Sequence, residues 1–544
     1  MALQHDRIVS IGLMGRLKLL YPFLFVIIPM LHVLARNPGG STLSDVGELM
    51  LAMLVASAVL YGVAALALRR GPERQHVPLV VVLVIIWFYA YPGVRWAYHQ
   101  AGGAPAQKIM MGAALLALAL LTFAGVWWLA RRPRLLERVN TFFALTGVLL
   151  VVFLGARVTA DELQARSQLR ASALLKEMNR PIGPSDPTPA GPGKPLRDIY
   201  LLVLDEYASS SVLRERFDFD NSVFEDSLRA LGFTVPQLVR SNYVHTLLSL
   251  PSLLNFSHLG ALRTELGPRA TDPGIPNYLV ENNRTAAFLK ARGYRFVFYP
   301  SQWWISTRHN RNADTEFQAW TGFDLAREAS LSDMRRAFIR TTPFALLQRG
   351  DAHDADHLLR TLRALEQLPA VEGPTFAFAH ILNPHYPYVF DSACKVYRVR
   401  PNQGWGSGRQ EIYLEQVQCL NNLLLGTVTQ LLQRSSPEPI ILLVGDHGTN
   451  SLEASTARSA DAVSPVQARE RFGVLGAFNL PAGGERLFAD SMTLVNLVPR
   501  VLNHYFDAGI KLPADTLYMS VEGDPYSLVP VDPASLSPRM GGID

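Results

Sequence analysis

Long apolar segments occupy the N-terminal part of the chain, and short apolar runs separated by amphipathic stretches occupy the rest. The long segments have about the 17–25 mostly apolar residues needed to cross the hydrocarbon core of a bilayer, the last being the shortest. They follow one another with short polar loops, which favours membrane spans over buried helices of a soluble core. We therefore expect five spans, at Leu19–Ala35, Leu49–Leu68, Pro78–Trp96, Ile109–Ala130 and Phe142–Ala156.

The basic residues around these segments predict how the chain is oriented. They gather before the first span, after the second and after the fourth, at Arg7, Arg16, Lys18, Arg69, Arg70, Arg74, Arg131, Arg132, Arg134 and Arg138. The other two loops are poorer in basic residues. The positive-inside rule then places the N-terminus in the cytoplasm. Five crossings place everything after residue 160 on the periplasmic or extracellular side of the cytoplasmic membrane.

Two changes of composition divide the chain into three parts. Residues 160–180 have a helical composition with mixed charges, and they form either an amphipathic helix on the membrane surface or a solvated helix. A stretch rich in proline and glycine follows, and its composition predicts an extended linker. We expect a transmembrane domain at 1–159, a linker with an interfacial helix at 160–196, and an exported catalytic domain at 197–544.

Short apolar runs that alternate with helical stretches predict an α/β fold for the exported domain. The runs are residues 199–205, 294–300, 375–381, 440–446 and 472–480. Nearly continuous apolar runs are typical of strands buried on both faces, as in a mostly parallel sheet between helices. In such sheets the ligand site lies at the carboxyl ends of the strands.

Composition and charge limit the possible partners of the protein, and the positions of its cysteines indicate an oxidising compartment. Hydrophobic residues make up 49% of the chain and the net charge is only +5, with no basic tract that carries interleaved aromatics, so we expect no nucleic-acid partner. The two cysteines, Cys394 and Cys419, both lie in the predicted exported domain. In an oxidising compartment they predict one disulfide, the alternative being two buried free thiols.

Polar residues at the ends of two predicted strands suggest a metal site. Asp205 ends the first run, and Asp446 with His447 ends the fourth. Carboxylate and imidazole groups are ligands for a divalent metal. The plainer alternatives are a helix cap at Asp205 and a simple turn at Asp446–Gly448.

Two further segments carry candidate catalytic residues. Thr246 precedes an apolar run, where a hydroxyl at a helix start is well placed to react if a metal lowers its pKa; otherwise it is an N-cap. His380 and His385 follow the third run and are held among prolines. They suit an oxyanion or leaving-group role, although a single histidine there is more often structural.

Together these motifs resemble the alkaline-phosphatase and sulfatase superfamily, and within it the membrane-bound lipoteichoic acid synthases and lipid A phosphoethanolamine transferases. The matching features are Asp205 after a strand, Thr246-Leu-Leu-Ser249-Leu-Pro251, the segment from His380 to Tyr388, and Asp446-His447-Gly448. The resemblance implies a catalytic Thr246 and a metal held by Asp205, Thr246, Asp446 and His447. It assigns contact with the transferred phosphoryl group to His385 and, less closely, to His380. The chain departs from the pattern in having Asp205 where the membrane transferases usually have glutamate.

The resemblance implies a phosphotransferase with one divalent metal. Carboxylate, imidazole and hydroxyl ligands suit zinc, our first choice, and manganese, our second. Phosphoethanolamine or phosphoglycerol would pass from a phospholipid donor to an envelope glycan or lipid acceptor through a phospho-threonine. Ser249-Leu-Pro-Ser-Leu253 lacks the arginine of the sulfatase nucleophile motif, which argues against the sulfatase mechanism. The alternatives are a membrane-anchored phosphate or sulfate ester hydrolase and a non-catalytic binding module on the same fold.

The orientation can be tested with a reporter enzyme that is active only outside the cytoplasm. Fused after Asp544, it should be active, because five crossings carry the C-terminus out of the cytoplasm. A silent exported reporter together with an active cytoplasmic reporter at the same position would show that the five-span topology is wrong.

Overall fold

The computed structural model describes residues 2–36, 43–67, 76–100, 105–182, 195–301, 307–317, 342, 352–397, 409–488 and 491–536. These residues form two compact units, one built mainly from residues 1–167 and the other from residues 168–323 and 349–544.

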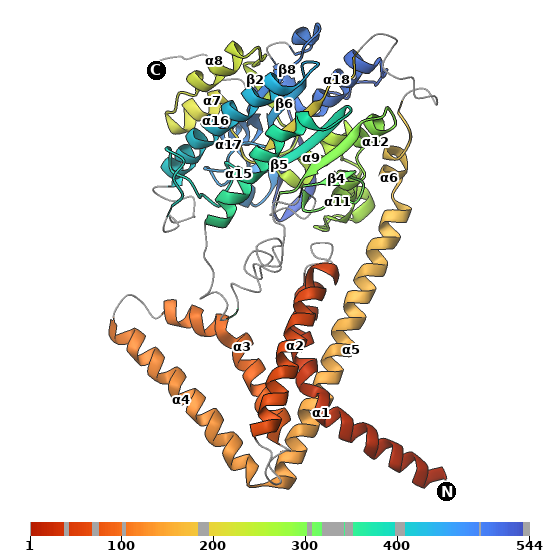
Figure 1. Cartoon of the computed structure of the whole chain (residues 1–544), viewed down its shortest axis with the longest axis vertical. Helices are drawn as coiled ribbons and strands as arrows, with labels where there is room; N and C mark the ends of the chain where they lie inside the picture. Colours follow the sequence, from red (N-terminus) through yellow and green to blue (C-terminus); the bar gives the residue numbers. More distant parts are fainter. Residues whose placement is uncertain are drawn as a thin grey trace. The chain divides into compact units, whose positions relative to one another are not determined.

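Long helices make up the first unit (Figure 1). They are α1 (Ala2–Arg36), α2 (Leu43–Ala67), α3 (Val77–Gln100), α4 (Pro105–Ala130) and α5 (Pro133–Ala171). Among the described residues, four helical stretches are long and apolar enough to cross a membrane: Gly15–Arg36, Val46–Ala67, Ala113–Ala130 and Pro133–Ala171. The third expected span falls in α3, whose apolar stretch Val77–Tyr91 is shorter. The helices therefore match the expected positions, and four of the five meet the length criterion.

Helices α2 and α4 expose large apolar side chains, such as Leu51 and Val59 on α2 and Leu121 and Phe123 on α4, each more than half exposed. Apolar surface of this extent is unfavourable in water and is the surface expected to face lipid. At the end of α4, the guanidinium groups of Arg131 and Arg132 stack over Trp127 and Trp128. Aromatic and basic side chains of this kind are typical of a membrane interface.

The segment expected as an interfacial helix continues α5 to Ala171 and then forms the short helix α6 (Ala173–Met178). The Ser172 side chain caps α6 by accepting a hydrogen bond from the backbone N–H of Leu175. Leu174, Leu175 and Met178 are buried in a hydrophobic cluster of the second unit, with Tyr243 and Leu248 among its members. These leucines therefore pack against protein.

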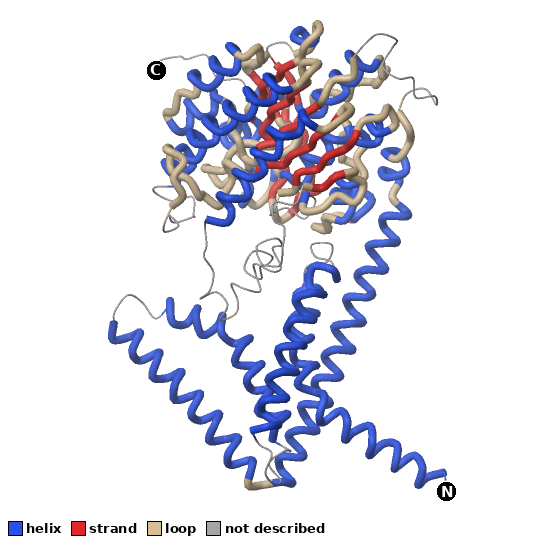
Figure 2. Tube along the Cα trace, in the orientation of Figure 1, coloured by secondary structure: helices blue, strands red, loops and turns tan. Residues whose placement is uncertain are grey.

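A six-stranded sheet forms the centre of the second unit, with helices on both faces (Figure 2). Its strand order is β4-β3-β5-β1-β6-β8, and all neighbours are parallel except β6 and β8. The strands are β1 (Ile199–Leu204), β3 (Arg295–Tyr299), β4 (Thr315–Glu316), β5 (Thr375–Ile381), β6 (Ile440–Gly445) and β8 (Gly476–Asn479). The α/β class and the mostly parallel sheet are confirmed, and the antiparallel edge strand makes the sheet mixed.

Alternate residues of the central strand point into two hydrophobic clusters. Leu202 and Leu204 pack with α15 (Ala352–Gln367) and α16 (Arg409–Arg434) on one face. Leu201 and Val203 pack on the other face with α9 (Thr246–Asn255), α12 (Arg284–Lys290) and α18 (Leu497–Phe506). Burial on both faces explains why β1 is apolar at every position.

The last apolar run, at residues 472–480, forms two strands. Gly473–Val474 is β7, which joins a small sheet of order β7-β2-β9, while β8 joins the large sheet. The other strands are β2 (Leu238–Arg240), β9 (Ser491–Thr493) and the hairpin β10 (Leu517–Val521) with β11 (Asp524–Val531). The remaining α-helices among the described residues of this unit are α7 (Ser210–Phe217), α8 (Ser222–Ala230), α10 (Leu262–Leu266), α11 (Gly274–Glu281) and α17 (Pro465–Phe472).

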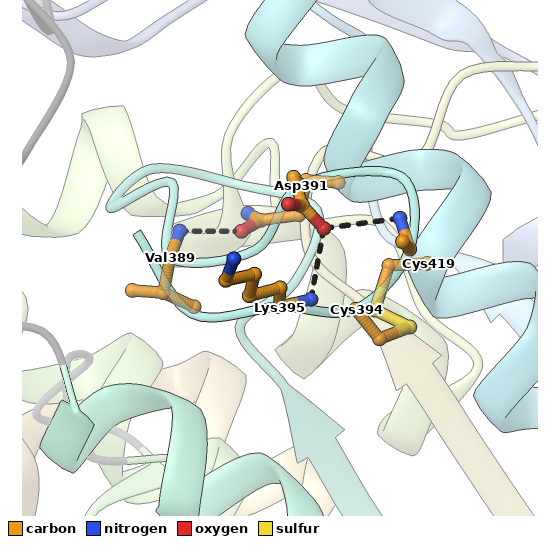
Figure 3. The surroundings of a disulfide bond; sticks show 7 residues. Val389, Asp391, Cys394, Lys395 and Cys419 are labelled. Carbon is orange, nitrogen blue, oxygen red and sulfur yellow. Dashed lines mark hydrogen bonds between the residues drawn. A yellow bond between two sulfur atoms is a disulfide. The ribbon is translucent and has the colours of Figure 1, made fainter. Parts of the chain in front are cut away.

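The expected disulfide is confirmed: Cys394, in the loop after β5, is bonded to Cys419 on α16. Beside the disulfide, the Asp391 carboxylate accepts hydrogen bonds from the backbone N–H groups of Ala393 and Lys395 (Figure 3). The backbone N–H of Val389 donates to the Gln416 side chain on α16. The disulfide and these hydrogen bonds fasten the loop after β5 to α16.

We expect two thiols to react with a maleimide after the unfolded protein is reduced, and none before reduction. The double substitution Cys394→Ser and Cys419→Ser should lower the free energy of unfolding by about 3 kcal/mol, because the disulfide closes a long loop in the unfolded chain. Thermal unfolding of the detergent-solubilised full chain measures the change. Reaction of both cysteines in the unreduced, unfolded protein would contradict the bond.

Candidate active site

Three of the predicted ligands lie together at the carboxyl edge of the large sheet. Strand β1 lies between β5 and β6, in a register that pairs Leu204 with both Ile381 and Gly445. The next residues of β1 and β6, Asp205 and Asp446, are therefore neighbours, and the backbone N–H of Asp446 donates to the Leu204 carbonyl. Ligand atoms of Asp205, Asp446 and His447 lie within 4.8 Å of one another, and all three residues are buried.

One oxygen of the Asp446 carboxylate accepts hydrogen bonds, and the other accepts none from the described residues. Its Oδ1 accepts hydrogen bonds from the backbone N–H groups of Glu206 and His447. Its Oδ2 is buried, has no hydrogen-bond partner among the described residues, and lies 3.7 Å from His447 Nε2. Burial raises the pKa of this carboxyl, against the opposing charge of His380. A buried carboxylate oxygen without a donor is costly, and a cation would satisfy it.

The unprotonated ring nitrogen of His447 faces the carboxylates of Asp205 and Asp446. Its Nδ1 lies 3.0 Å from the Gly448 carbonyl oxygen, so Nδ1 carries the proton and Nε2 is the free base. Nε2 lies 3.5 Å from Asp205 Oδ1. Burial, with the nearby Arg471 charge, holds the pKa of His447 well below its ordinary value. A neutral imidazole facing two carboxylates fits a divalent cation, so these residues suit the expected metal.

Thr246 is the first residue of α9 and reaches this group. Its Oγ1 lies 3.1 Å from His447 Nε2, and the side chain is buried. The Ser249 hydroxyl, three residues on, contacts the carbonyl oxygens of Tyr243 and His245 and so fixes the turn before the helix. The amino-terminal peptide N–H groups of a helix favour negative charge, which suits a reactive oxygen or a phosphoryl group.

The structure places the two candidate histidines differently. His380 is buried on β5, with Nδ1 2.9 Å from Thr307 Oγ1 and Nε2 3.7 Å from Asp205 Oδ2. Burial lowers the pKa of His380 to about 4. It lines a separate, smaller cavity. His385 lies beyond the strand, where its backbone N–H donates to the Asp205 carbonyl and its side chain lines the larger cavity beside Thr246.

The larger cavity has a volume of about 390 Å³ and opens beside Thr246. Its lining comprises Glu206, His245, Thr246, His385, His447, Asn450, Glu453, Ser455, Thr456, Arg471 and Glu522. The space is large enough for a phospholipid head group.

Sequence reasoning did not single out Arg471, which is buried at this cavity. Its guanidinium donates to the carbonyl oxygens of Gly448 and Val244, which joins the turn after β6 to the segment before α9. Arg471 Nη1 also lies 3.8 Å from Glu206 Oε1. Residue 471 comes from α17, whose sequence has no feature that separates this arginine from Arg469, so only the folded chain identifies it.

Helix α16 holds two of the loops that form the site. The Gln416 side chain donates to the carbonyl oxygens of Pro384 and His385, and so fixes the loop that carries His385. The Tyr413 hydroxyl donates to the Glu206 carbonyl and accepts from the Ala208 backbone N–H. Both residues precede the disulfide-bonded Cys419 on the same helix.

A family described as Sulfatase matches residues 227–498, half of the chain. No curated protein matches the sequence.

Among solved structures, the C-terminal periplasmic domain of EcEptC from Escherichia coli is similar at 12% identity, covering 65% of this chain and 97% of that one, with a TM-score of 0.43. The integral membrane protein lipooligosaccharide phosphoethanolamine transferase A (EptA) from Neisseria meningitidis is similar at 14% identity, covering 82% and 79%, with a TM-score of 0.38. A protein of a glycosaminoglycan-metabolism locus in Bacteroides thetaiotaomicron shows 14% identity over 62% and 84%, with a TM-score of 0.37.

Metal content distinguishes a ligand from a nucleophile at this site. Asp446→Asn should lower the affinity for zinc more than the ~10–100-fold usual for loss of an outer-shell partner, because it removes a charged ligand. Thr246→Ala should keep most of the metal, since three ligands remain. Elemental analysis after dialysis against limiting zinc measures both, with the exposed Asp461→Asn as matched control. Equal metal content in the Asp446 variant and the control would show that Asp446 is not a metal ligand.

Proposed function

The chain belongs to the Sulfatase family of the alkaline-phosphatase and sulfatase superfamily. From the geometry of its site, we propose that it is a metal-dependent membrane phosphotransferase. It would move a phosphoethanolamine or phosphoglycerol group from a phospholipid to an envelope glycan or lipid. The reaction would pass through a phosphorylated Thr246.

One observation carries this proposal: a buried threonine hydroxyl at a helix start lies against a buried group of two carboxylates and a neutral imidazole. A threonine that served only as an N-cap would have its hydroxyl directed at the backbone of its own helix. Thr246 Oγ1 instead faces His447, far away in the sequence. The threonine, the ligand group and an adjoining cavity are what a covalent phosphoryl transfer needs.

Asp205, Thr246, Asp446 and His447 would hold one divalent metal, zinc as first choice and manganese as second, because oxygen and imidazole ligands suit both. When bound, the metal lowers the pKa of the threonine hydroxyl and offsets negative charge on the phosphoryl oxygens.

The residues of this chain then have separate tasks. The Thr246 hydroxyl, its pKa lowered, gives its proton to solvent, and Oγ1 bonds to the phosphorus of the donor while the bond from phosphorus to the diacylglycerol oxygen breaks. His385, at the cavity wall, supplies a proton to that leaving oxygen, and the helix start of α9 favours the negative phosphoryl group. His380 would act through Asp205, since its Nε2 lies beside Oδ2 of that carboxylate. An acceptor hydroxyl or phosphate displaces the threonine and regenerates it.

The proposed setting is the outer face of the cytoplasmic membrane, with five spans and an exported catalytic domain. The apolar helices α1, α2, α4 and α5 support membrane insertion, and the disulfide supports an oxidising compartment. An anchored enzyme suits a lipid donor, because the donor's phosphate stays at the membrane surface. Neither proposed substrate is a nucleic acid.

Mass spectrometry of the metal-loaded protein incubated with phospholipid should find a head-group adduct on Thr246. Thr246→Ala should abolish it and lower diacylglycerol release about 10³-fold or more, because the nucleophile is lost. His385→Ala should form the adduct some 10²–10⁴-fold more slowly, the usual scale for a positioned acid.

The fate of the adduct separates the alternatives. Transfer of the head group to an added acceptor identifies a transferase, whereas release of the free head-group phosphate to water identifies a hydrolase. A folded, metal-loaded protein that forms no adduct and releases no diacylglycerol would refute the proposed chemistry and favour a binding module.

A further inference from the structure

Helix α6 packs with the segment that carries the candidate nucleophile. Its residues Leu174 and Leu175 are buried in a hydrophobic cluster of the second unit. Tyr243 and Leu248 belong to the same cluster, and they flank Thr246 in the sequence. Helix α6 contacts α11, and α11 in turn contacts α9. The helix that directly follows α5 is therefore part of the packing around the start of α9.

The side chains of α9 are divided between two hydrophobic clusters. Leu250 and Leu254 pack in the cluster that covers one face of the large sheet. Leu248 is buried in the cluster that includes α6, and Leu247 packs against that cluster. Interiors are close-packed, so a helix held between two layers shifts when either layer is loosened. The position of Thr246, in the first turn of α9, therefore depends on the layer that contains α6 as well as on the sheet.

Tyr243 connects the cluster to the turn before α9. Its hydroxyl accepts a hydrogen bond from the backbone N–H of Leu259 at 2.7 Å, and its carbonyl oxygen accepts one from the Ser249 hydroxyl at 3.1 Å. Its buried ring stacks on that of Tyr518, with the ring centroids 5.6 Å apart. A change in the packing around Tyr243 is therefore transmitted to the backbone just before Thr246.

Helix α6 is held in place by two hydrogen bonds in addition to its packing. It has six residues, too few for a helix that is stable by itself in water. The Ser172 hydroxyl accepts from the backbone N–H of Leu175, and the Glu265 carboxylate on α10 accepts from the backbone N–H of Leu174 at 2.8 Å. These N–H groups lie in the first turn, where a helix offers them no partner of its own. The fold therefore fixes α6 at a defined place in the cluster.

From these contacts we propose that Leu174 and Leu175 of α6 are positioning residues for Thr246. The docked helix would hold the first turn of α9 in place, so that Thr246 Oγ1 stays directed at His447 Nε2, from which it lies 3.1 Å. The inference rests on the proposed function, because it concerns the orientation of the same nucleophile. It goes beyond that function by making the segment after the last predicted span a functional part of the catalytic unit.

The test compares two substitutions that truncate buried leucines in the metal-loaded full chain. Leu175→Ala shortens a side chain of α6, and Leu431→Ala shortens one of α16 in the cluster on the face of the sheet opposite α9. Diacylglycerol release is measured from mixed detergent micelles of phosphatidylethanolamine and phosphatidylglycerol.

In Leu175→Ala, kcat should fall roughly tenfold, because a small displacement of a reacting group lowers the rate strongly. KM and bound zinc should stay at their wild-type values, since the cavity and three metal ligands are unchanged. Leu431→Ala should lower the temperature of unfolding to a similar extent while keeping kcat. Leu175→Met should recover most of the rate, because it conserves the buried volume.

Hydrogen exchange supplies a second measurement, which does not depend on the reaction. Peptides covering residues 243–250 should exchange faster in Leu175→Ala than in the wild type, because one of the two layers around α9 is loosened. In Leu431→Ala the same peptides should exchange at the wild-type rate.

Equal losses of kcat in the two alanine variants would overturn the proposal, because the loss would then follow stability alone. Unchanged kcat in Leu175→Ala would overturn it as well, whether or not exchange at residues 243–250 is faster, and would leave the phosphotransferase mechanism intact. Absence of diacylglycerol release and of a Thr246 adduct in the wild type would instead refute the proposed function, and this inference with it.

Discussion

The site depends on the placement of two carboxylates in the interior of the second unit. Asp205 and Asp446 end neighbouring parallel strands, so the ladder that stabilises the sheet also brings their negative charges together. Burial of like charges is strongly unfavourable unless a cation or hydrogen-bond donors compensate them. Backbone N–H groups compensate one oxygen of Asp446, and the other oxygen faces the neutral nitrogen of His447. A cation at this point would compensate both carboxylates.

The elements around the carboxylates keep this geometry fixed. Helix α16 fixes the loops after β1 and β5 through Tyr413 and Gln416, and the disulfide at Cys419 ties the same helix to the chain beyond His385. Helix α17 fixes two further segments. Its Arg471 donates hydrogen bonds that join the turn after β6 to the segment before α9. Catalytic groups held to well under an ångström need such support, because small displacements cost large factors in rate.

The two units differ in where their apolar side chains lie. Its helices expose leucine, valine and phenylalanine side chains, whereas the sheet of the second unit buries the same residue types on both faces. The first pattern is stable only in lipid and the second only in a protein core. The first unit therefore suits a membrane, and the cavity beside Thr246 in the second unit has a polar lining.

Local sequence was sufficient to predict most of the long helices and buried strands and several residues of the site. Apolar length indicated the helices of the first unit, and runs such as 199–205 and 440–446 indicated strands buried on both faces, because burial determines composition position by position. Polar residues at strand ends pointed to Asp205, Asp446 and His447. The hydroxyl at a predicted helix start made Thr246 a candidate, and the resemblance gave it the catalytic role. The sequence did not show the splitting of residues 472–480 between two sheets, since strand pairing is set by partners remote in the chain. Nor did it reveal Arg471, which lies at the cavity because α17 packs beside the turn after β6 and the segment before α9. Sequence thus determined which segments are buried and which chemical groups end the strands, while the tertiary structure decided which charges share one cavity, because that depends on packing between segments with no local signal in common.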